Sequence, residues 1–219
     1  MNQLFEKISI EYCFSMEQKN QYWQFINFLQ VENTKYNLTR IFDTNAIIYH
    51  HIIDALEISK YNILDLGNVI YDIGSGAGIP GILLAIFYPN KIFYLNEVTE
   101  KKIFFLKNAI ILLKLKNCII LSDDFLTVIR RRKIAVDVFI ARASIPLNLI
   151  IDIYKYKFYE KSKIVYWVGT SWRENKNHNN VLYNKNIIIH EYDYVLQDPD
   201  NMKKHIYLLI KKIDKNSIK

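Results

Sequence analysis

Four of the six glycines in this 219-residue chain fall within eight residues, directly after the apolar run VIYDI. They are Gly74, Gly76, Gly78 and Gly81. Glycine loses more conformational entropy on folding than any other residue, so such a cluster indicates backbone that approaches a ligand closely or adopts a positive φ. A strand that leads into a glycine turn and then a helix is where open α/β sheets bind ligands, past the carboxyl ends of their strands.

Three classes of ligand suit such a turn: nucleoside triphosphates, dinucleotides and S-adenosylmethionine. A Walker A loop would need Lys and then Ser or Thr after its last glycine, whereas Ile79 and Pro80 follow Gly78. The dinucleotide spacing GxGxxG would need a glycine at position 79, and a carboxylate at Asp72 would repel a pyrophosphate. S-adenosylmethionine has no phosphate, and Asp72 can attract its sulfonium and ammonium groups. We therefore expect S-adenosylmethionine at this turn.

Acidic residues at the ends of the next two predicted strands favour the same ligand. Glu97 ends the run KIFYLNE, where it could accept hydrogen bonds from both ribose hydroxyls. In the later segment SDDF, Asp123 or Asp124 could bind the adenine amino group while Phe125 lines the ring pocket. Each acid alone could be an ordinary exposed residue at a strand end. The prediction depends on their order at three successive strand ends.

Short β-branched and aromatic runs must position these residues. Strands are predicted over 69–73, 91–97, 118–122, 136–141 and 163–169, and helices over 81–88 and 100–114. This alternation predicts a parallel sheet with right-handed crossovers. Two further runs, 186–196 and 205–213, flank the turn-rich segment QDPDN and predict an antiparallel pair.

The first 60 residues lack this alternation and are predicted to be helical. Ser15 could cap one helix, whose apolar positions recur with helical spacing from Trp23 to Leu29, and Asp43 or Thr44 could cap another. We therefore expect residues 1–60 to form a helical extension packed on the core, and residues 61–219 to form the sheet domain.

The chain has a formal net charge of +7 and a pI near 9.2, which suggests a polyanionic partner, although AT-rich coding would also favour its many Lys and Asn residues. The run RRRK at 130–133 is either a solvated face or a set of phosphate contacts, and NKNHNN is expected to be a loop. No run of about 18 uncharged apolar residues predicts a membrane span, and the N-terminus does not resemble a secretory signal. We expect a cytoplasmic protein with no metal site, in which Cys13 and Cys118 are reduced and mostly buried.

Five segments, taken together, resemble the ribosomal small-subunit methyltransferase G family, also called glucose-inhibited division protein B. They are, in order, YNLTRI, HHIIDAL, YDIGSGAGIPGILLAIFYPN, EKKIFFLKNAIILLKLKN and FIARAS. The resemblance runs from about Trp23 to the end of the chain. It implies a Rossmann-like class I methyltransferase whose seven-stranded sheet is mostly parallel, with an antiparallel C-terminal pair. It also implies S-adenosylmethionine as donor and N7 of one guanine in 16S rRNA as target, in naked rRNA or in an assembling small ribosomal subunit. We expect a bacterial, cytoplasmic monomer.

The resemblance also implies roles for single residues. The cofactor pocket would include Gly74, Ile79, Glu97, one of Asp123 and Asp124, and Arg142 of IARAS, and we expect Gly76 of the glycine turn to contact the cofactor as well. Asn37, His51 and Asp54 match helical elements that close over the cofactor and the target base, so Asn37, His51 and Arg142 are the predicted catalytic residues. Three features depart from the family pattern: Ala55 replaces a usual serine, Val168 replaces a common lysine, and SDDF aligns only with a small gap.

Guanine N7 carries an in-plane lone pair and no proton, so methyl transfer to it needs positioning rather than a general base. Arg142 would then bind guanine O6, a phosphate or the cofactor carboxylate. His51 and Asp54, at i and i+3, could equally form a local hydrogen-bonded pair. The sequence leaves two other functions open. One is a non-catalytic RNA- or ribosome-binding protein with a decayed pocket, and the other, more distant, is a nicotinamide-dependent dehydrogenase.

Overall fold

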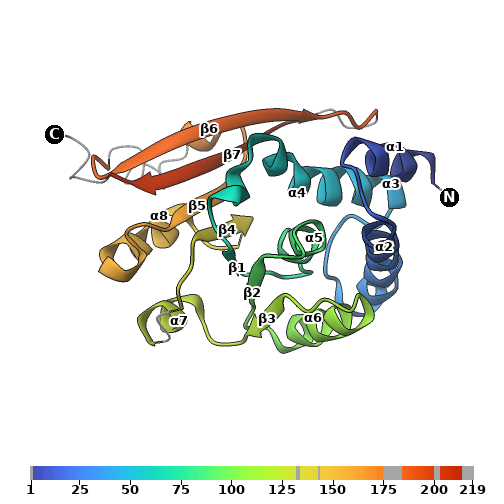
Figure 1. Cartoon of the computed structure of the whole chain (residues 1–219), viewed down its shortest axis with the longest axis horizontal. Helices are drawn as coiled ribbons and strands as arrows, with labels where there is room; N and C mark the ends of the chain where they lie inside the picture. Colours follow the sequence, from blue (N-terminus) through green and yellow to red (C-terminus); the bar gives the residue numbers. More distant parts are fainter. Residues whose placement is uncertain (1, 132–133, 143, 175–183, 200–202, 214–219) are drawn as a thin grey trace.

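The computed structural model describes residues 2–131, 134–142, 144–174, 184–199 and 203–213. Within these residues the chain forms a seven-stranded sheet in the order β3-β2-β1-β4-β5-β7-β6 (Figure 1). The strands are β1 (Val69–Ile73), β2 (Ile92–Asn96), β3 (Cys118–Leu121), β4 (Val138–Arg142), β5 (Lys163–Val168), β6 (Ile187–Leu196) and β7 (Lys203–Lys212). Strands β1 to β5 pair in parallel, whereas β7 is antiparallel to both β5 and β6. The predicted fold class is confirmed.

Side chains alternate between the two faces of the sheet because the strand period is two residues. Ile70 and Ile140 pack on one face and Tyr71 and Phe139 on the other, and all four are fully buried. Helices cover both faces, so the strands read in the sequence as almost continuous apolar runs. The sheet therefore lies between two hydrophobic cores.

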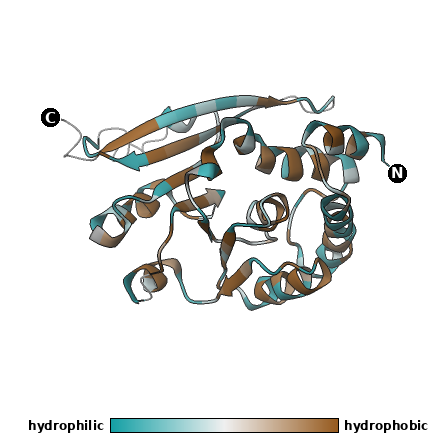
Figure 2. Ribbon diagram, viewed as in Figure 1, coloured by the Kyte–Doolittle hydropathy of each residue, from teal (hydrophilic) through white to brown (hydrophobic). Residues whose placement is uncertain are grey.

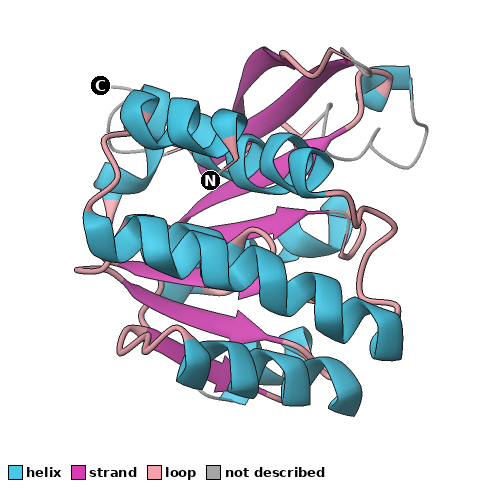
Figure 3. Ribbon diagram, turned by 90° about the vertical axis from the view of Figure 1, so that its right-hand side faces the viewer, coloured by secondary structure: helices cyan, strands magenta, loops and turns pink. Residues whose placement is uncertain are grey.

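One face of the sheet is covered by the N-terminal helices together with α5 and α6 (Figures 1 and 3). The helices of this face are α1 (Gln3–Glu11), α2 (Met16–Tyr36), α5 (Gly81–Phe87) and α6 (Glu100–Leu112). The other face packs against α7 (Phe125–Arg131), α8 (Leu147–Ile150) and the 3₁₀ turns η4 (Ile151–Lys155) and η5 (Lys157–Tyr159). A further 3₁₀ turn, η6 (Trp172–Glu174), follows β5. Helix α5 lies between the sheet and α2 and is apolar along its length (Figure 2).

After a non-helical segment at residues 37–43, helical structure resumes and runs almost to β1 through five short segments. They are α3 (Thr44–Ile47), the π-helix η1 (Ile48–Ile53), α4 (Asp54–Leu56), η2 (Glu57–Tyr61) and η3 (Ile63–Leu66). The predicted helical extension is thus helical as expected, and its helices continue past residue 60 to Leu66. The predicted domain boundary at residue 60 stays a prediction. Phe25 and Leu29 of α2 pack in the same hydrophobic core as Leu83 and Phe105, which lie beyond that boundary.

The predicted helix caps are present. Ser15 and Gln18 form a capping box at the start of α2, and the Asp43 side chain accepts hydrogen bonds from the backbone N–H groups of Asn45 and Ala46. Helix α2 is tied to α5 through the buried Tyr22 hydroxyl, which donates to the Leu83 carbonyl at 2.8 Å. These contacts fix the N-terminal helices against the sheet domain.

Both cysteines are free, but the prediction of mostly buried thiols is wrong for Cys13, which is exposed. Cys13 has a φ of +53° in the turn between α1 and α2, and this turn lies at the surface. Cys118 is half-buried at the start of β3. None of the helices in the described part of the chain combines the length and the apolar character needed to cross a bilayer.

Candidate functional site

A cavity of about 610 Å³ opens at the carboxyl ends of β1, β2 and β4, which is the edge of the sheet that the sequence predicts for ligand binding. Its wall is formed by the glycine turn after β1, the end of β2, the start of α6, the start of α7 and the end of β4. Leu38, Thr39 and His51 of the N-terminal helical region line it as well. The predicted site residues among its lining are Gly74, Gly76, Ile79, Glu97, Asp124, Phe125, Arg142 and His51.

The glycine turn owes its composition to its backbone conformation. Gly74, Gly76 and Gly78 have φ values of +68°, +57° and +75°, a region that other residues rarely adopt. At Gly74 a Cβ would also lie 2.5 Å from the Ser144 Cβ, so no larger residue fits there. The turn is fastened to β2 because the Ser75 N–H donates to the Asn96 carbonyl at 2.8 Å.

Asp72 does not line the cavity; it lies beneath the glycine turn and is 1% exposed. Its Oδ2 accepts a hydrogen bond from the Gly81 N–H at 3.2 Å, and a Cβ on Gly81 would lie only 2.4 Å from that oxygen. Burial raises the pKa of Asp72 to about 7, although the hydrogen bonds from Ser75 and Gly81 oppose that rise. The predicted contact between Asp72 and the ligand is therefore corrected: the Asp72 carboxyl group lies under the glycine turn and is hydrogen-bonded to the backbone there.

Glu97 lies at the end of β2 and joins the glycine turn to the start of α6. Its Oε2 accepts from the Gly76 N–H at 3.0 Å, and its Oε1 accepts from the N–H groups of Val98 and Thr99 at 3.0 and 2.9 Å. The side chain is 6% exposed and faces the cavity. Three backbone donors thus fix the direction in which this carboxylate points.

The structure separates the two aspartates of SDDF. Asp124 lines the cavity and also caps α7, because its side chain accepts hydrogen bonds from the backbone N–H and the hydroxyl of Thr127. Asp123 is not part of the lining, and its backbone carbonyl accepts from the Asn96 amide at 2.7 Å. Of the two alternatives, Asp124 is the one placed beside Phe125 at the cavity.

The π-helix η1 presents His50 and His51 in different directions. The Asp54 N–H donates to the carbonyls of Tyr49 and His51 rather than to that of His50. The His50 carbonyl oxygen accepts instead from His51 Nδ1 at 3.0 Å. A carbonyl only accepts, so Nδ1 carries the proton and Nε2 of a neutral ring accepts from the Thr39 hydroxyl at 3.1 Å. Burial, reinforced by the charge of Arg142, lowers the pKa of His51 to about 4. His51 is therefore neutral at physiological pH.

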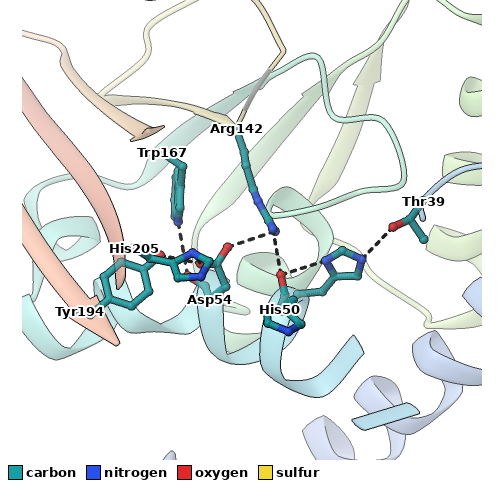
Figure 4. Close-up of polar contacts among 8 residues, drawn as sticks. Thr39, His50, Asp54, Arg142, Trp167, Tyr194 and His205 are labelled. Atoms are coloured by element: carbon teal, nitrogen blue, oxygen red, sulfur yellow. Dashed lines mark hydrogen bonds and ion pairs between the residues drawn. The ribbon is translucent and has the colours of Figure 1, made fainter. Parts of the chain in front are cut away.

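Arg142 enters the cavity from the end of β4 with two of its nitrogens already held (Figure 4). Its Nη2 donates to the His50 carbonyl at 2.8 Å, and its Nη1 forms an ion pair with Asp54 Oδ2 at 3.1 Å. The Arg142 side chain is 23% exposed, whereas that of Asp54 is 1% exposed. The predicted local pair of His51 and Asp54 is wrong: His51 bonds to Thr39, and Asp54 is taken by Arg142, Tyr194 and His205.

Other residues singled out by the sequence lie outside the cavity. Asn37 is the exposed C-cap of α2, with a φ of +50°, and its neighbours Leu38 and Thr39 line the cavity in its place. Ala55 and Val168, two of the three departures from the family pattern, do not line it. Arg130 and Arg131 are exposed on α7, while positions 132–133 of RRRK and the run NKNHNN lie outside the described residues.

Sequence reasoning missed several residues of the cavity and its surroundings. Ser144 belongs to the segment FIARAS, Thr39 to YNLTRI and Lys102 to EKKIFF, so the motifs pointed to the right segments without singling out these side chains. Tyr194 and His205, which contact Asp54, carry no local signal at all. Within the described ranges, no group of three or more His, Cys, Asp or Glu side chains is arranged to hold a metal ion.

A second concavity, of about 870 Å³, lies at the opposite edge of the sheet, near the start of β5 and the end of β7. Its lining includes Lys155, Lys161, Lys163, Lys211 and Lys212, together with Asp152 and Glu160. None of the predicted site residues is there.

Comparison with known sequences identifies one family. The sequence profile described as rRNA small subunit methyltransferase G matches residues 18–202. A protein from Mycoplasma capricolum named Ribosomal RNA small subunit methyltransferase G is 37% identical over 143 residues, 65% of this chain and 61% of that protein. Proteins of the same name from Mycoplasma mycoides and Shewanella sp. W3-18-1 are each 41% identical, over 51% and 46% of this chain and 80% and 48% of their own lengths. The chain thus spans less than two thirds of the first and third of these relatives.

Solved structures of methyltransferases have the same fold as this chain. A putative O-methyltransferase from Klebsiella pneumoniae superposes with a TM-score of 0.62 at 10% identity, covering 85% of this chain and 90% of the other. A putative methyltransferase from Streptococcus mutans, solved in complex with SAH, superposes with a TM-score of 0.51 at 14% identity, covering 73% and 98%. Identities this low show the fold alone, which is that of the class I methyltransferases.

Proposed function

Because this chain belongs to the rRNA small subunit methyltransferase G family, we propose that it transfers a methyl group from S-adenosylmethionine to N7 of a guanine in 16S rRNA. The proposed substrate is that rRNA or an assembling small ribosomal subunit, and the proposed enzyme is a cytoplasmic monomer. The observation that carries the proposal is the cavity at the carboxyl ends of the strands, where the glycine turn, Glu97 and Arg142 meet.

The residues of the cavity fit the cofactor. Its volume of about 610 Å³ is typical of small-molecule sites. Glu97 accepts three backbone hydrogen bonds, and since a carboxylate offers about four acceptor positions, one position on Oε2 is left for a ribose hydroxyl, beside Lys102 Nζ, which pairs with the same oxygen at 3.8 Å. The Ser144 Oγ is buried at the cavity and has no hydrogen-bond partner among the described residues, so a ligand acceptor or donor would satisfy it.

In this assignment Glu97 would bind the ribose, Phe125 would pack on the adenine ring, and Asp124 would accept from the adenine amino group. Ser144 would donate a hydrogen bond to the carboxylate at the other end of the cofactor. When bound, S-adenosylmethionine supplies an electrophilic methyl group on a sulfonium. The chain's own part is to hold donor and target in line, with the reacting atoms roughly 3–3.5 Å apart.

Arg142 is the proposed contact with the target base. Guanine N7 must stay free to react, so a guanidinium beside the base would bind O6 alone rather than O6 and N7 together. With one nitrogen held by Asp54 and another by the His50 carbonyl, the guanidinium has little freedom to turn toward N7.

His51 is assigned no role as a base. Its Nε2 accepts from Thr39 and its Nδ1 donates to a carbonyl, so neither nitrogen is free to take a proton, and N7 has none to give. We propose that His51 instead holds the wall of the cavity between the segment after α2 and the π-helix.

Two measurements test the proposed function. Isothermal titration calorimetry with S-adenosylmethionine should show binding that Glu97→Lys abolishes and that Glu100→Lys leaves unchanged. Glu100 makes a matched control because the charge change is the same and this exposed residue, three positions along the chain, does not line the cavity. Wild-type protein that does not bind the cofactor would contradict the proposal.

The target is tested by mapping N7-methylguanine through borohydride and aniline cleavage of 16S rRNA from a strain that lacks this gene. Loss of one cleavage site, restored by the wild-type gene and not by the Glu97→Lys gene, is expected. An unchanged map would favour the alternative, a non-catalytic RNA- or ribosome-binding protein. Cofactor binding together with an unchanged map would retain the donor site and reject the target.

A further inference from the structure

The C-terminal hairpin reaches the cavity through one buried carboxylate. Asp54 Oδ1 accepts a hydrogen bond from the Tyr194 hydroxyl at 2.6 Å and pairs with His205 Nδ1 at 3.1 Å (Figure 4). Its Oδ2 faces Arg142 Nη1 at 3.1 Å. Asp54 therefore stands between two residues of the hairpin and Arg142, which lines the cavity at the end of β4.

Tyr194 and His205 act on Asp54 as a pair because of the sheet register. They lie directly opposite each other on β6 and β7, with ring centroids 5.5 Å apart. A slip of either strand by one residue would turn its side chain to the other face of the sheet. The long pairing of β6 with β7, from Ile187–Lys212 to Leu196–Lys203, fixes both donors at once.

The hairpin also holds the second acceptor of Arg142. Asp198, just after β6, pairs through Oδ2 with His50 Nε2 at 2.7 Å, and the His50 carbonyl is the group that accepts from Arg142 Nη2. Trp167 Nε1 of β5 donates to the Asp54 carbonyl at 3.4 Å. The two groups that bind the guanidinium are thus each tied to the C-terminal strands.

The negative charge of Asp54 is paired with the positive charge of Arg142. Burial raises the pKa of Asp54, but Arg142 and the hydrogen bonds from His205 and Tyr194 outweigh it, so the pKa lies below its ordinary value and the carboxylate is ionised. Burial, reinforced by Asp54, raises the pKa of Tyr194, so its hydroxyl keeps the proton that it donates. Because the Asp54 carboxylate is buried and contacts Tyr194, His205 and Arg142, it is held in one orientation.

We infer that Tyr194 and His205 are positioning residues: by fixing Asp54 Oδ1 they aim Asp54 Oδ2, and with it the Arg142 guanidinium, into the cavity. The kinetic consequence rests on the proposed methyl transfer, whereas the arrangement itself can be tested without any substrate. Neither residue touches the cavity, so each acts through Arg142.

The kinetic test compares Tyr194→Phe with Tyr207→Phe in the full chain. Tyr207 is a matched control because its hydroxyl, on the same hairpin, is buried with no hydrogen-bond partner in the described part of the chain. We expect Tyr194→Phe to lower kcat roughly tenfold to a hundredfold through misplacement of Arg142. The Kd for S-adenosylmethionine should change less than about twofold, and Tyr207→Phe should leave both unchanged.

A double-mutant cycle separates positioning from general damage to the fold. If Tyr194 acts through Arg142, adding Tyr194→Phe to an Arg142→Lys background should lower kcat little further. His205→Asn, which keeps a side-chain N–H for Asp54, should retain more activity than His205→Ala. Additive losses in the cycle, or equal losses for the two His205 variants, would overturn the inference.

The arrangement is tested separately by NMR on protein with ¹⁵N-labelled arginine. The Arg142 side-chain signals, assigned by their loss in Arg142→Lys, should show separate, slowly exchanging Nη protons in the wild type and in Tyr207→Phe. Tyr194→Phe should lose that separation. If it does, the inference stands even where the rRNA map is unchanged and the proposed function fails; unaltered Nη signals would overturn it whatever the activity.

Discussion

At the scale of single residues, two acids of the site have different surroundings although they occupy similar places at strand ends. Glu97 faces the cavity and accepts three backbone hydrogen bonds, whereas Asp72 is buried under the glycine turn, where the Gly81 N–H donates to its Oδ2. Burial raises the pKa of Asp72 to about 7 from an ordinary value of 3.8. Its charge therefore affects stability rather than ligand binding.

Asp72→Asn should change the dependence of stability on pH. Between about pH 4 and pH 7 the unfolded chain ionises Asp72 while the folded protein keeps it protonated, so the folded state binds more protons and stability falls as pH rises. Asn cannot ionise, and its amide oxygen can still accept from the Gly81 N–H. At pH 8 the variant should be more stable by about 2–4 kcal/mol, a gain that shrinks toward pH 4.

Urea unfolding of both proteins at pH 4.5, 6, 7 and 8 measures this difference in the free energy of unfolding. Each protein serves as the control for all other titrating groups, since only position 72 differs. A difference that stays constant across the four pH values would contradict the assigned pKa of Asp72.

At the scale of elements, α2 is the helix on which the N-terminal region is built. Its first turn is closed by the capping box of Ser15 and Gln18, and the Gln18 amide also donates to the carbonyls of Ile86 and Phe87 at the end of α5. The same first turn therefore caps one helix and satisfies the C-terminal carbonyls of another. The segment after α2 supplies Leu38 and Thr39 to the cavity, so the placement of this helix bears on the site.

Ser15→Ala should lower the free energy of unfolding by about 1 kcal/mol, because the Gln18 N–H loses the oxygen that caps it. Ser15→Thr keeps a hydroxyl at the same position and should retain most of the stability. Urea unfolding checks both variants. Equal stability of the alanine and threonine variants would show that the capping box contributes nothing.

At the scale of the whole molecule, the net charge of +7 is the feature that fits the proposed RNA substrate. Arg130 and Arg131 are exposed at the end of α7, the helix whose first residue, Phe125, lines the cavity. Lys114 and Lys116 are also exposed, but they lie between α6 and the start of β3, at the opposite edge of the sheet. The two pairs carry equal charge at different places.

Arg130→Ala with Arg131→Ala should weaken binding of 16S rRNA and reduce the slope of log K against log salt by up to about 2, because each lost phosphate contact no longer releases counterions. Lys114→Ala with Lys116→Ala removes the same charge and should change the slope less. Filter binding over a series of salt concentrations measures both. Identical slopes for the two double variants would show that the effect is net charge alone, without local contacts.

The fold class, and the edge of the sheet at which the candidate site lies, could be predicted from the amino-acid sequence. Strand and helix periods are local, and they predict the parallel sheet because each run is long enough to show its pattern. The glycine turn and Glu97 were found for the same reason: the constraints on them, positive φ and a strand end, are set by neighbours in the chain.

Which side chains face the cavity depends instead on packing between segments that are distant in the chain. Asp72 and Asp124 stand at similar places in the sequence pattern, but packing buries the first under Gly81 and leaves the second on the cavity wall. Asp54 contacts Tyr194, which lies 140 positions further along the chain, and this contact depends on the register of β6 with β7. Such contacts have no local signal, because they depend on which strands pair and which face each residue takes.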